Sequence, residues 1–174
     1  VLTSKGPSDL SSIDCTLCTS STVITASGTQ FQGLVKSCYA DASKCPEGIP
    51  IGCWNTSKVT DMAFAFSYES FDESINCWNT ARVTNMNTMF RGATDFNQPI
   101  NDWNVASVTN MQGMFQEATN FNQPINDWNV GGVIDTSFMF YQASNFNQPL
   151  NDWNVASVNN MGIMFYKANN FNQP

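Results

Sequence analysis

The chain of 174 residues carries a formal net charge of −7, contains no histidine and has only 12% charged residues. The absence of histidine excludes Ser/His/Asp and Cys/His catalysis, as well as zinc sites that use imidazole. Fourteen acidic residues against seven basic ones argue against binding to nucleic-acid phosphates. No stretch of the sequence is apolar over the length that a bilayer span requires.

Residues 1–50 contain four of the six cysteines and no Asn, Trp or Met. Cys15 and Cys18 have a C-x-x-C spacing, which also occurs in zinc and redox motifs. However, Cys38 and Cys45 do not form a second such pair, and no strand-then-helix unit surrounds the first. An even number of thiols in a small segment rich in Ser and Thr favours structural disulfides in an oxidising compartment. The pairing among these four has three possibilities, all of which stay open.

One short helix is predicted near the middle of this segment. Thr29-Gln30-Phe31-Gln32 matches a capping box. The apolar residues that follow lie on one helical face: Phe31, Leu34, Val35 and Cys38. Because the end of a repeat stack exposes an apolar cross-section, we expect residues 1–50 to form an N-terminal cap held by two disulfides.

Residues 51–174 consist of a repeat of about 25 residues marked by tryptophan. The marking residues are Trp54, Trp78, Trp103, Trp128 and Trp153. A unit with so few apolar positions cannot bury its own hydrophobic face, so the copies must stack and share a core. We therefore predict a repeat solenoid that is leucine-rich-repeat-like, with about five coils of short parallel strands and 3₁₀ or helical turns. In the third coil the strand is expected over 107–111 and the turn over 113–118.

The recurring polar and apolar positions have structural explanations. The Met and Phe columns are expected to be stacked core rather than a cofactor pocket, and no cofactor is predicted. Two asparagine columns, which begin at Asn55 and Asn97, are expected to form amide ladders between coils. Asp102, Asp127 and Asp152 also stack; a calcium site there is an alternative, but capping of each turn by its own Asp is favoured.

The first two coils have cysteine where later coils have aspartate. Cys53 and Cys77 occupy the position before Trp, one coil apart. Neighbouring coils are expected to lie about 4.8 Å apart, so the two Cα atoms fall within disulfide range and we predict the bridge Cys53–Cys77. Asn55-Thr56-Ser57 is a glycosylation acceptor sequence, which agrees with a secretory route.

The sequence given stops at Pro174 in mid-repeat, without a polar or disulfide-bonded closing unit. We expect the apolar end of the stack, with Met164, Phe165 and Phe171, to be covered by further chain or by another molecule. Head-to-tail association through this end is the form of self-association that it predicts.

The repeat resembles a known family. The segment from Phe96 to Phe115 reads Phe-Asn-Gln-Pro-Ile-Asn-Asp-Trp-Asn-Val-Ala-Ser-Val-Thr-Asn-Met-Gln-Gly-Met-Phe and is similar to the BspA-like bacterial-surface-protein short repeats, a leucine-rich-repeat variant. The segment from Gly52 to Met62 resembles the start of such arrays, and the resemblance covers about 51–174. It implies an extracellular or cell-surface array used in adhesion, protein interaction or wall structure, with no catalytic residues to transfer.

Two functional hypotheses follow. The first is a secreted or cell-surface structural or interaction module that is not an enzyme, with a protein partner, other copies of itself included, or a glycan. Assembly head-to-tail into a fibre is its most specific form. The second is a carbohydrate-active enzyme or glycan-binding protein on a solenoid scaffold. Glu69, Asp72 and Glu73 form the only local acidic cluster of the repeats and are expected to be solvated.

Overall fold

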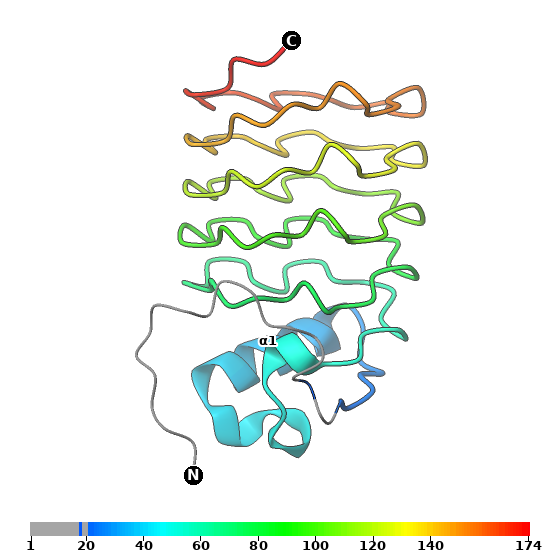
Figure 1. Cartoon of the computed structure of the whole chain (residues 1–174), viewed down its shortest axis with the longest axis vertical. Helices are drawn as coiled ribbons and strands as arrows, with labels where there is room; N and C mark the ends of the chain where they lie inside the picture. Colours follow the sequence, from blue (N-terminus) through cyan, green and yellow to red (C-terminus); the bar gives the residue numbers. More distant parts are fainter. Residues whose placement is uncertain (1–17, 19–20) are drawn as a thin grey trace.

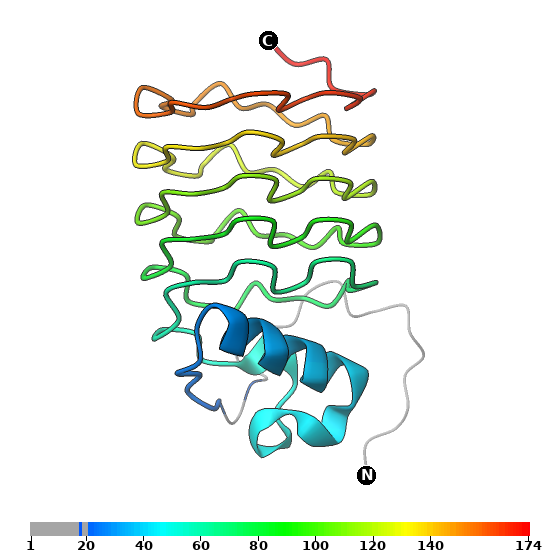
Figure 2. The same ribbon diagram turned by 180° about the vertical axis from the view of Figure 1, so that it is seen from behind.

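The computed structural model describes residue 18 and residues 21–174. These residues form a stack of similar coils, with helix α1 (Thr29–Ala40) lying across the end where the first coil begins (Figures 1 and 2). Three short 3₁₀ turns lead from α1 into that coil: η2 (Ala42–Lys44), η3 (Pro46–Gly48) and η4 (Ile51–Cys53). No helix in the described range is long and apolar enough to cross a membrane.

The predicted helix is present, but its start differs from the prediction. Gly28 is the N-cap, with a φ of 56° and no side-chain cap, so Thr29 lies inside the helix and the capping box is wrong. The Gly28 N–H donates to the Asp61 carbonyl at 2.9 Å. This bond fixes the start of the helix to the first coil, and the positive φ that it requires is one that glycine adopts easily. Phe31 and Val35 are buried, which confirms the predicted apolar face.

The coils are joined by parallel backbone hydrogen bonds, yet no continuous strand forms within the described range. Isolated bridges connect one position of each coil, in the order Asp61, Asn85, Asn110, Asp135 and Asn160. The strand predicted over 107–111 is thus reduced to the bridge at Asn110. The pairing is interrupted because the N–H of Val108 turns back to the carbonyl of Val105.

The second half of each coil alternates between two hydrogen-bond directions. In the third coil, the N–H groups of residues 111, 113, 115 and 117 donate to the next coil, whereas those of 114, 116 and 118 donate to the carbonyl three residues earlier. Gly113 and Glu117 have left-handed φ values of 59° and 61°. A helix requires right-handed backbone at every residue, so the helical turn predicted over 113–118 does not form.

The interior consists of stacked aromatic ladders, flanked by the buried Met columns that the sequence predicts as core. In the best-packed ladder, ring centroids are 5.3–5.8 Å apart from coil to coil: Phe66, Phe90, Phe115, Phe140 and Phe165. The indole nitrogens of the Trp ladder donate to backbone carbonyls, as Trp103 Nε1 does to Ile75 at 3.3 Å. The described residues therefore form a repetitive aromatic ladder with one short helix at its end.

Helix α1 covers the first coil through aromatic contacts. The Phe31 ring meets Trp54 and Trp78 edge-on, with centroids 6.3 and 5.6 Å apart. The Tyr39 ring lies 5.6 Å from Phe71. These contacts fit a cap at this end, while the division of the chain into 1–50 and 51–174 stays a prediction.

The disulfide between Cys53 and Cys77 predicted from the repeat spacing is wrong. Cys53 is bonded to Cys18, with 5.4 Å between the Cα atoms. A parallel bridge between Val23 and Asn55 places the segment before α1 beside the first coil, so that Cys18 reaches Cys53 from the side opposite to the second coil. Cys53 also ends the 3₁₀ turn η4, so it does not share the backbone of the later coils at this position.

The remaining thiols are also oxidised where the structure describes them. Cys38 is bonded to Cys45, with 4.4 Å between the Cα atoms, and this bond lies wholly within the predicted cap. Cys77 is disulfide-bonded as well, and Cys15 lies outside the described residues. The prediction of two disulfides within the cap is therefore corrected. Cys38–Cys45 lies within the cap, whereas Cys18–Cys53 joins the segment before α1 to the first coil.

Candidate functional site

The asparagine column that begins at Asn97 forms the predicted ladder. The Asn97 Oδ1 accepts from the N–H of Asn122 at 3.0 Å, and the Asn122 Oδ1 accepts from the N–H of Asn147 at 2.9 Å. Gln123 and Gln148 donate to the same oxygens from their side-chain amides. The hydrogen bonds of these residues therefore join each coil to the next.

The column that begins at Asn55 does not form a ladder. The Oδ1 atoms of its members accept from the backbone N–H two residues later, as Asn104 does from Ala106 at 3.1 Å. Such local turns leave Asn79, Asn104 and the later members exposed. Asn55 itself is half-buried and accepts from Ser57, and its glycosylation stays a prediction.

The stacked aspartates bond between coils. Asp127 accepts from the Nδ2 of Asn101 at 2.5 Å, and Asp152 accepts from Asn126. The sequence predicts that each Asp caps its own turn, whereas these bonds join neighbouring turns. Within the described range, no group of three His, Cys, Asp or Glu side chains could hold a metal ion.

The acidic cluster of the first coil also has structural partners. Glu69 pairs with Lys36 of α1 at 3.4 Å, and Asp72 Oδ1 accepts from the N–H of Asn97 at 2.8 Å, as the first rung of the ladder. Burial, followed by the charges of Glu73 and Glu69, raises the pKa of Tyr39, whose hydroxyl donates to the Ser70 carbonyl. Asp72 and Glu73 are exposed, as expected for solvated carboxylates, although Asp72 also serves the ladder, whereas Glu69 is half-buried and paired with Lys36.

The predicted self-association residues lie together in the last coil. Met164 is buried, Phe165 and Phe171 are half-buried, and their rings are 4.2 Å apart. With Leu150 and Trp153 they line an apolar cleft of about 300 Å³. The role of this cleft in association stays a prediction.

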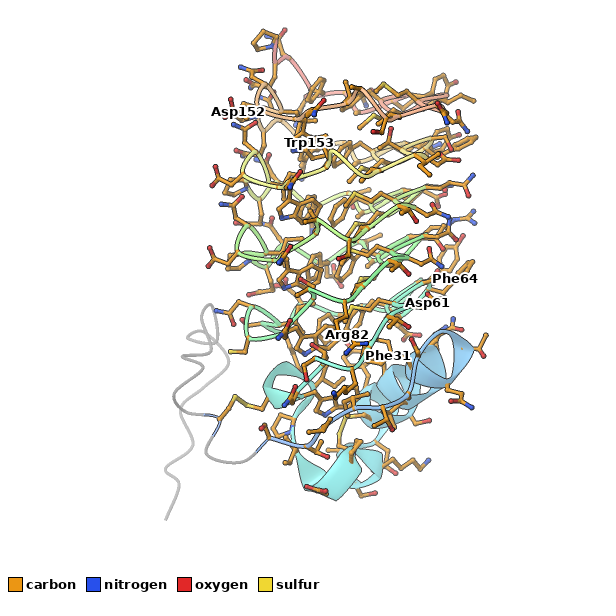
Figure 3. The ribbon with its side chains drawn as sticks, turned by 90° about the vertical axis from the view of Figure 1, so that its right-hand side faces the viewer. Phe31, Asp61, Phe64, Arg82, Asp152 and Trp153 are labelled. Atoms are coloured by element: carbon orange, nitrogen blue, oxygen red, sulfur yellow. A yellow bond between two sulfur atoms is a disulfide. The ribbon has the colours of Figure 1, made fainter. Side chains whose placement is uncertain are left out.

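A groove runs across the coils on the flank opposite to the stacked aspartates, the column that ends at Asp152. Figure 3 shows Phe64 and Asp152 at opposite edges of the stack. The groove consists of two shallow, open hollows of about 300 and 800 Å³ that share lining residues. Phe64, Asn87, Thr88 and Gln112 line the first hollow, Glu117, Tyr141, Gln142, Ile163 and Tyr166 line the second, and Arg91, Gln116 and Phe138 line both. We call this surface the flank groove.

One column of the repeat shapes the flank groove. Its members are Phe64, Thr88, Gly113, Phe138 and Ile163, all with φ between 48° and 60°. Thr88 and Gly113 are small, so the coils that carry them recede between the rings of Phe64 and Phe138. Phe64 is 44% exposed, and Ile163 is 53% exposed.

Amides and one ion pair supply the polar groups of the flank groove. The Asn87 Nδ2 donates to the Gln112 Oε1 at 3.0 Å, and the Gln116 Nε2 donates to Glu117 at 3.0 Å. Arg91 lies 3.8 Å from Glu117 and above the ring of Tyr68, 5.3 Å from its centroid. The Arg91 Nε is buried and has no hydrogen-bond partner among the described residues.

The flank groove could not be predicted from the repeat pattern. Residue types that recur in every coil indicate the core, whereas this column contains Phe, Thr, Gly, Phe and Ile. The available signal was an apolar side chain at a position where the repeat does not require one. Such a position contributes little to the core and is free to serve another role.

One family model matches the chain. The family described as "Mycoplasma protein of unknown function, DUF285" matches residues 34–137 and again residues 107–174. The two matches together run from within α1 to the last coil and overlap across residues 107–137. No curated protein and no solved structure gives a significant match.

Proposed function

Because the chain belongs to the DUF285 family, a BspA-like surface-protein repeat family, we propose that it is a structural or interaction module of an extracellular or cell-surface protein, and not an enzyme. The disulfides indicate an oxidising, extracellular location. We further propose that the stacked coils are a leucine-rich-repeat-like solenoid whose strands are shortened to single bridges.

The flank groove is the observation that carries this proposal. The groove crosses several coils, and each coil is fixed to the next by backbone bonds and ring stacking. A binding surface on so rigid a support loses little conformational entropy when a partner binds. The catalytic alternative is less well supported, because Asp72 is engaged in the amide ladder.

A binding panel tests the proposal. The protein would be applied to immobilised extracellular-matrix proteins and to polysaccharides, with reduced and alkylated protein as the control. We expect saturable binding by the disulfide-bonded protein and its loss in the control. Release of new sugar ends from a polysaccharide would instead identify an enzyme, and absence of binding to every surface would contradict the interaction module.

The apolar cleft of the last coil favours a second candidate, head-to-tail stacking. Its lining residues Trp153, Met164 and Phe171 belong to the same columns that pack coil on coil elsewhere. A further coil of the same kind therefore fits this surface, from the same chain or from a second molecule. Electron microscopy and light scattering would reveal filaments or higher mass in this protein and their loss in Phe171→Asp, whereas monomers at every concentration would contradict self-assembly.

A further inference from the structure

We propose that the flank groove binds a neutral glycan chain that lies across the coils, with its sugar rings stacked on the exposed and half-buried aromatic side chains of the groove. The inference rests on the proposed interaction module and assigns it a site and a class of ligand. Four observations support it: the rings, their backbone, the polar groups and the balance of charge.

Flat side chains recur along the groove. Phe64 and Phe138 lie three coils apart with the small Thr88 and Gly113 between them, and Tyr141 and Tyr166 continue the row with ring centroids 5.3 Å apart. Tyr166 is 52% exposed. The C–H face of a pyranose is flat and apolar, so it packs on such rings while its hydroxyls point to the sides.

The backbone under these rings is unfavourable for them. Phe64, Phe138 and Ile163 have φ values of 60°, 58° and 59°, in the left-handed region that bulky and β-branched residues avoid. Gly113 has the same conformation in the third coil and shows that glycine fits the position without strain. The conformation recurs at this position in every coil, so the fold imposes the backbone but does not need large apolar residues here.

Amide side chains border the rings. Asn87, Gln112, Gln116 and Gln142 line the two hollows, and each amide carries both donors and an acceptor. A sugar hydroxyl is likewise both donor and acceptor, so it can pair with either end of an amide. Arg91 lines both hollows, where its guanidinium pairs with Glu117.

The charges of the groove favour a neutral ligand. Among the lining residues of the two hollows, Arg91 and Glu117 carry charge, and they pair with each other at 3.8 Å. An acidic polysaccharide would meet the already paired Arg91 and, at the edge of the groove, Lys167 above the Tyr166 ring, within a protein of net charge −7. A protein partner is less well matched, because a stable protein interface has a desolvated core, whereas amides are interspersed among these rings.

Titration calorimetry with neutral hexasaccharides built from glucose, mannose, galactose or N-acetylglucosamine tests the inference. We expect at least one of them to bind, and Phe64→Leu and Phe138→Leu each to weaken its affinity about tenfold, because leucine keeps the apolar bulk but removes the flat face. Ile134→Ala is the matched control, since Ile134 is 47% exposed but lines neither hollow. Its affinity should equal that of the parent protein.

The outcomes separate this inference from the proposed function. Binding to an extracellular protein but to none of the neutral glycans would overturn the glycan site and leave the interaction module standing. Glycan binding that both leucine variants retain would overturn the location in the flank groove. Unfolding midpoints of the variants, measured in parallel, show that any lost affinity comes from a folded protein.

Discussion

The interior and the flank groove use the same repeating backbone in opposite ways. In the interior, the Trp column and the two Phe columns each hold one residue type, and Phe90, Phe115 and Phe140 stack with ring planes 0° and 8° apart. On the flank, the left-handed positions also recur in every coil, but their side chains range from glycine to phenylalanine. The difference shows that stacking fixes a residue type only where identical neighbours must pack against one another.

The interior rings hold the fold, whereas the flank side chains are available for binding. Interior rings are fully buried by the coils on either side, so any change is felt by two neighbours. Phe64 and Ile163 of the flank are exposed and rest on a backbone that glycine fits at least as well.

Truncation of an interior ring in mid-stack is expected to be the most damaging change. Phe115 is fully buried. Its ring centroid lies 3.9 Å from that of Phe121, and further rings contact it from both neighbouring coils. We expect Phe115→Ala to lower the free energy of unfolding by about 3–5 kcal/mol, because it leaves a cavity. Urea denaturation measures this loss. Tyr166→Ala, at an exposed flank position, should stay within about 0.5 kcal/mol, and similar losses for both would abolish the contrast.

The first coil tests whether the stack also depends on its covalent support. The disulfide Cys18–Cys53 spans 35 residues, whereas Cys38–Cys45 spans 7. In the chain-entropy account, the longer loop contributes about 4 kcal/mol and the shorter about 2 kcal/mol. We therefore expect the double variant Cys18→Ser, Cys53→Ser to unfold at lower denaturant than Cys38→Ser, Cys45→Ser. The reverse order would show that the segment before α1 does not support the first coil.

The two asparagine columns provide a matched pair on the polar surface. Asn122 Oδ1 accepts from Asn147 and Gln148 of the next coil, whereas exposed Asn104 accepts from Ala106 in its own turn. Asn122→Ala leaves two donors of the next coil without their acceptor, so we expect a loss of about 1–3 kcal/mol in urea denaturation. Asn104→Ala should cost less than about 1 kcal/mol. Equal costs would mean that the ladder adds nothing to a local turn.

The sequence predicts the interior well and the backbone poorly, for a physical reason. The Trp, Phe and Met columns can be recognised in the sequence because stacking favours the same side chain in each coil. All but their terminal members are buried. The strand over 107–111 and the turn over 113–118 were not predictable from propensity, because left-handed φ at Gly113 and Glu117 is imposed by the neighbouring coils. The disulfide Cys18–Cys53 depends on a segment outside the repeat and has no signal in the register.

The smallest expected effect is the most specific test of the flank. Phe64 has a φ of 60°, whereas Ile134 is similarly exposed and is not among the residues with positive φ. Comparing Gly with Ala at each position removes the side chain in both cases and leaves the backbone preference. At Phe64 we expect the Gly variant to be more stable than the Ala variant by about 1 kcal/mol, because alanine is strained in the left-handed region. At Ile134 the order should reverse by about 0.5–1 kcal/mol, because glycine loses more entropy on folding. Thermal unfolding of the four variants measures both differences. The same sign at both positions would show that the flank backbone relaxes when its side chain is removed, and that the strain beneath Phe64 is not a fixed property of the coil.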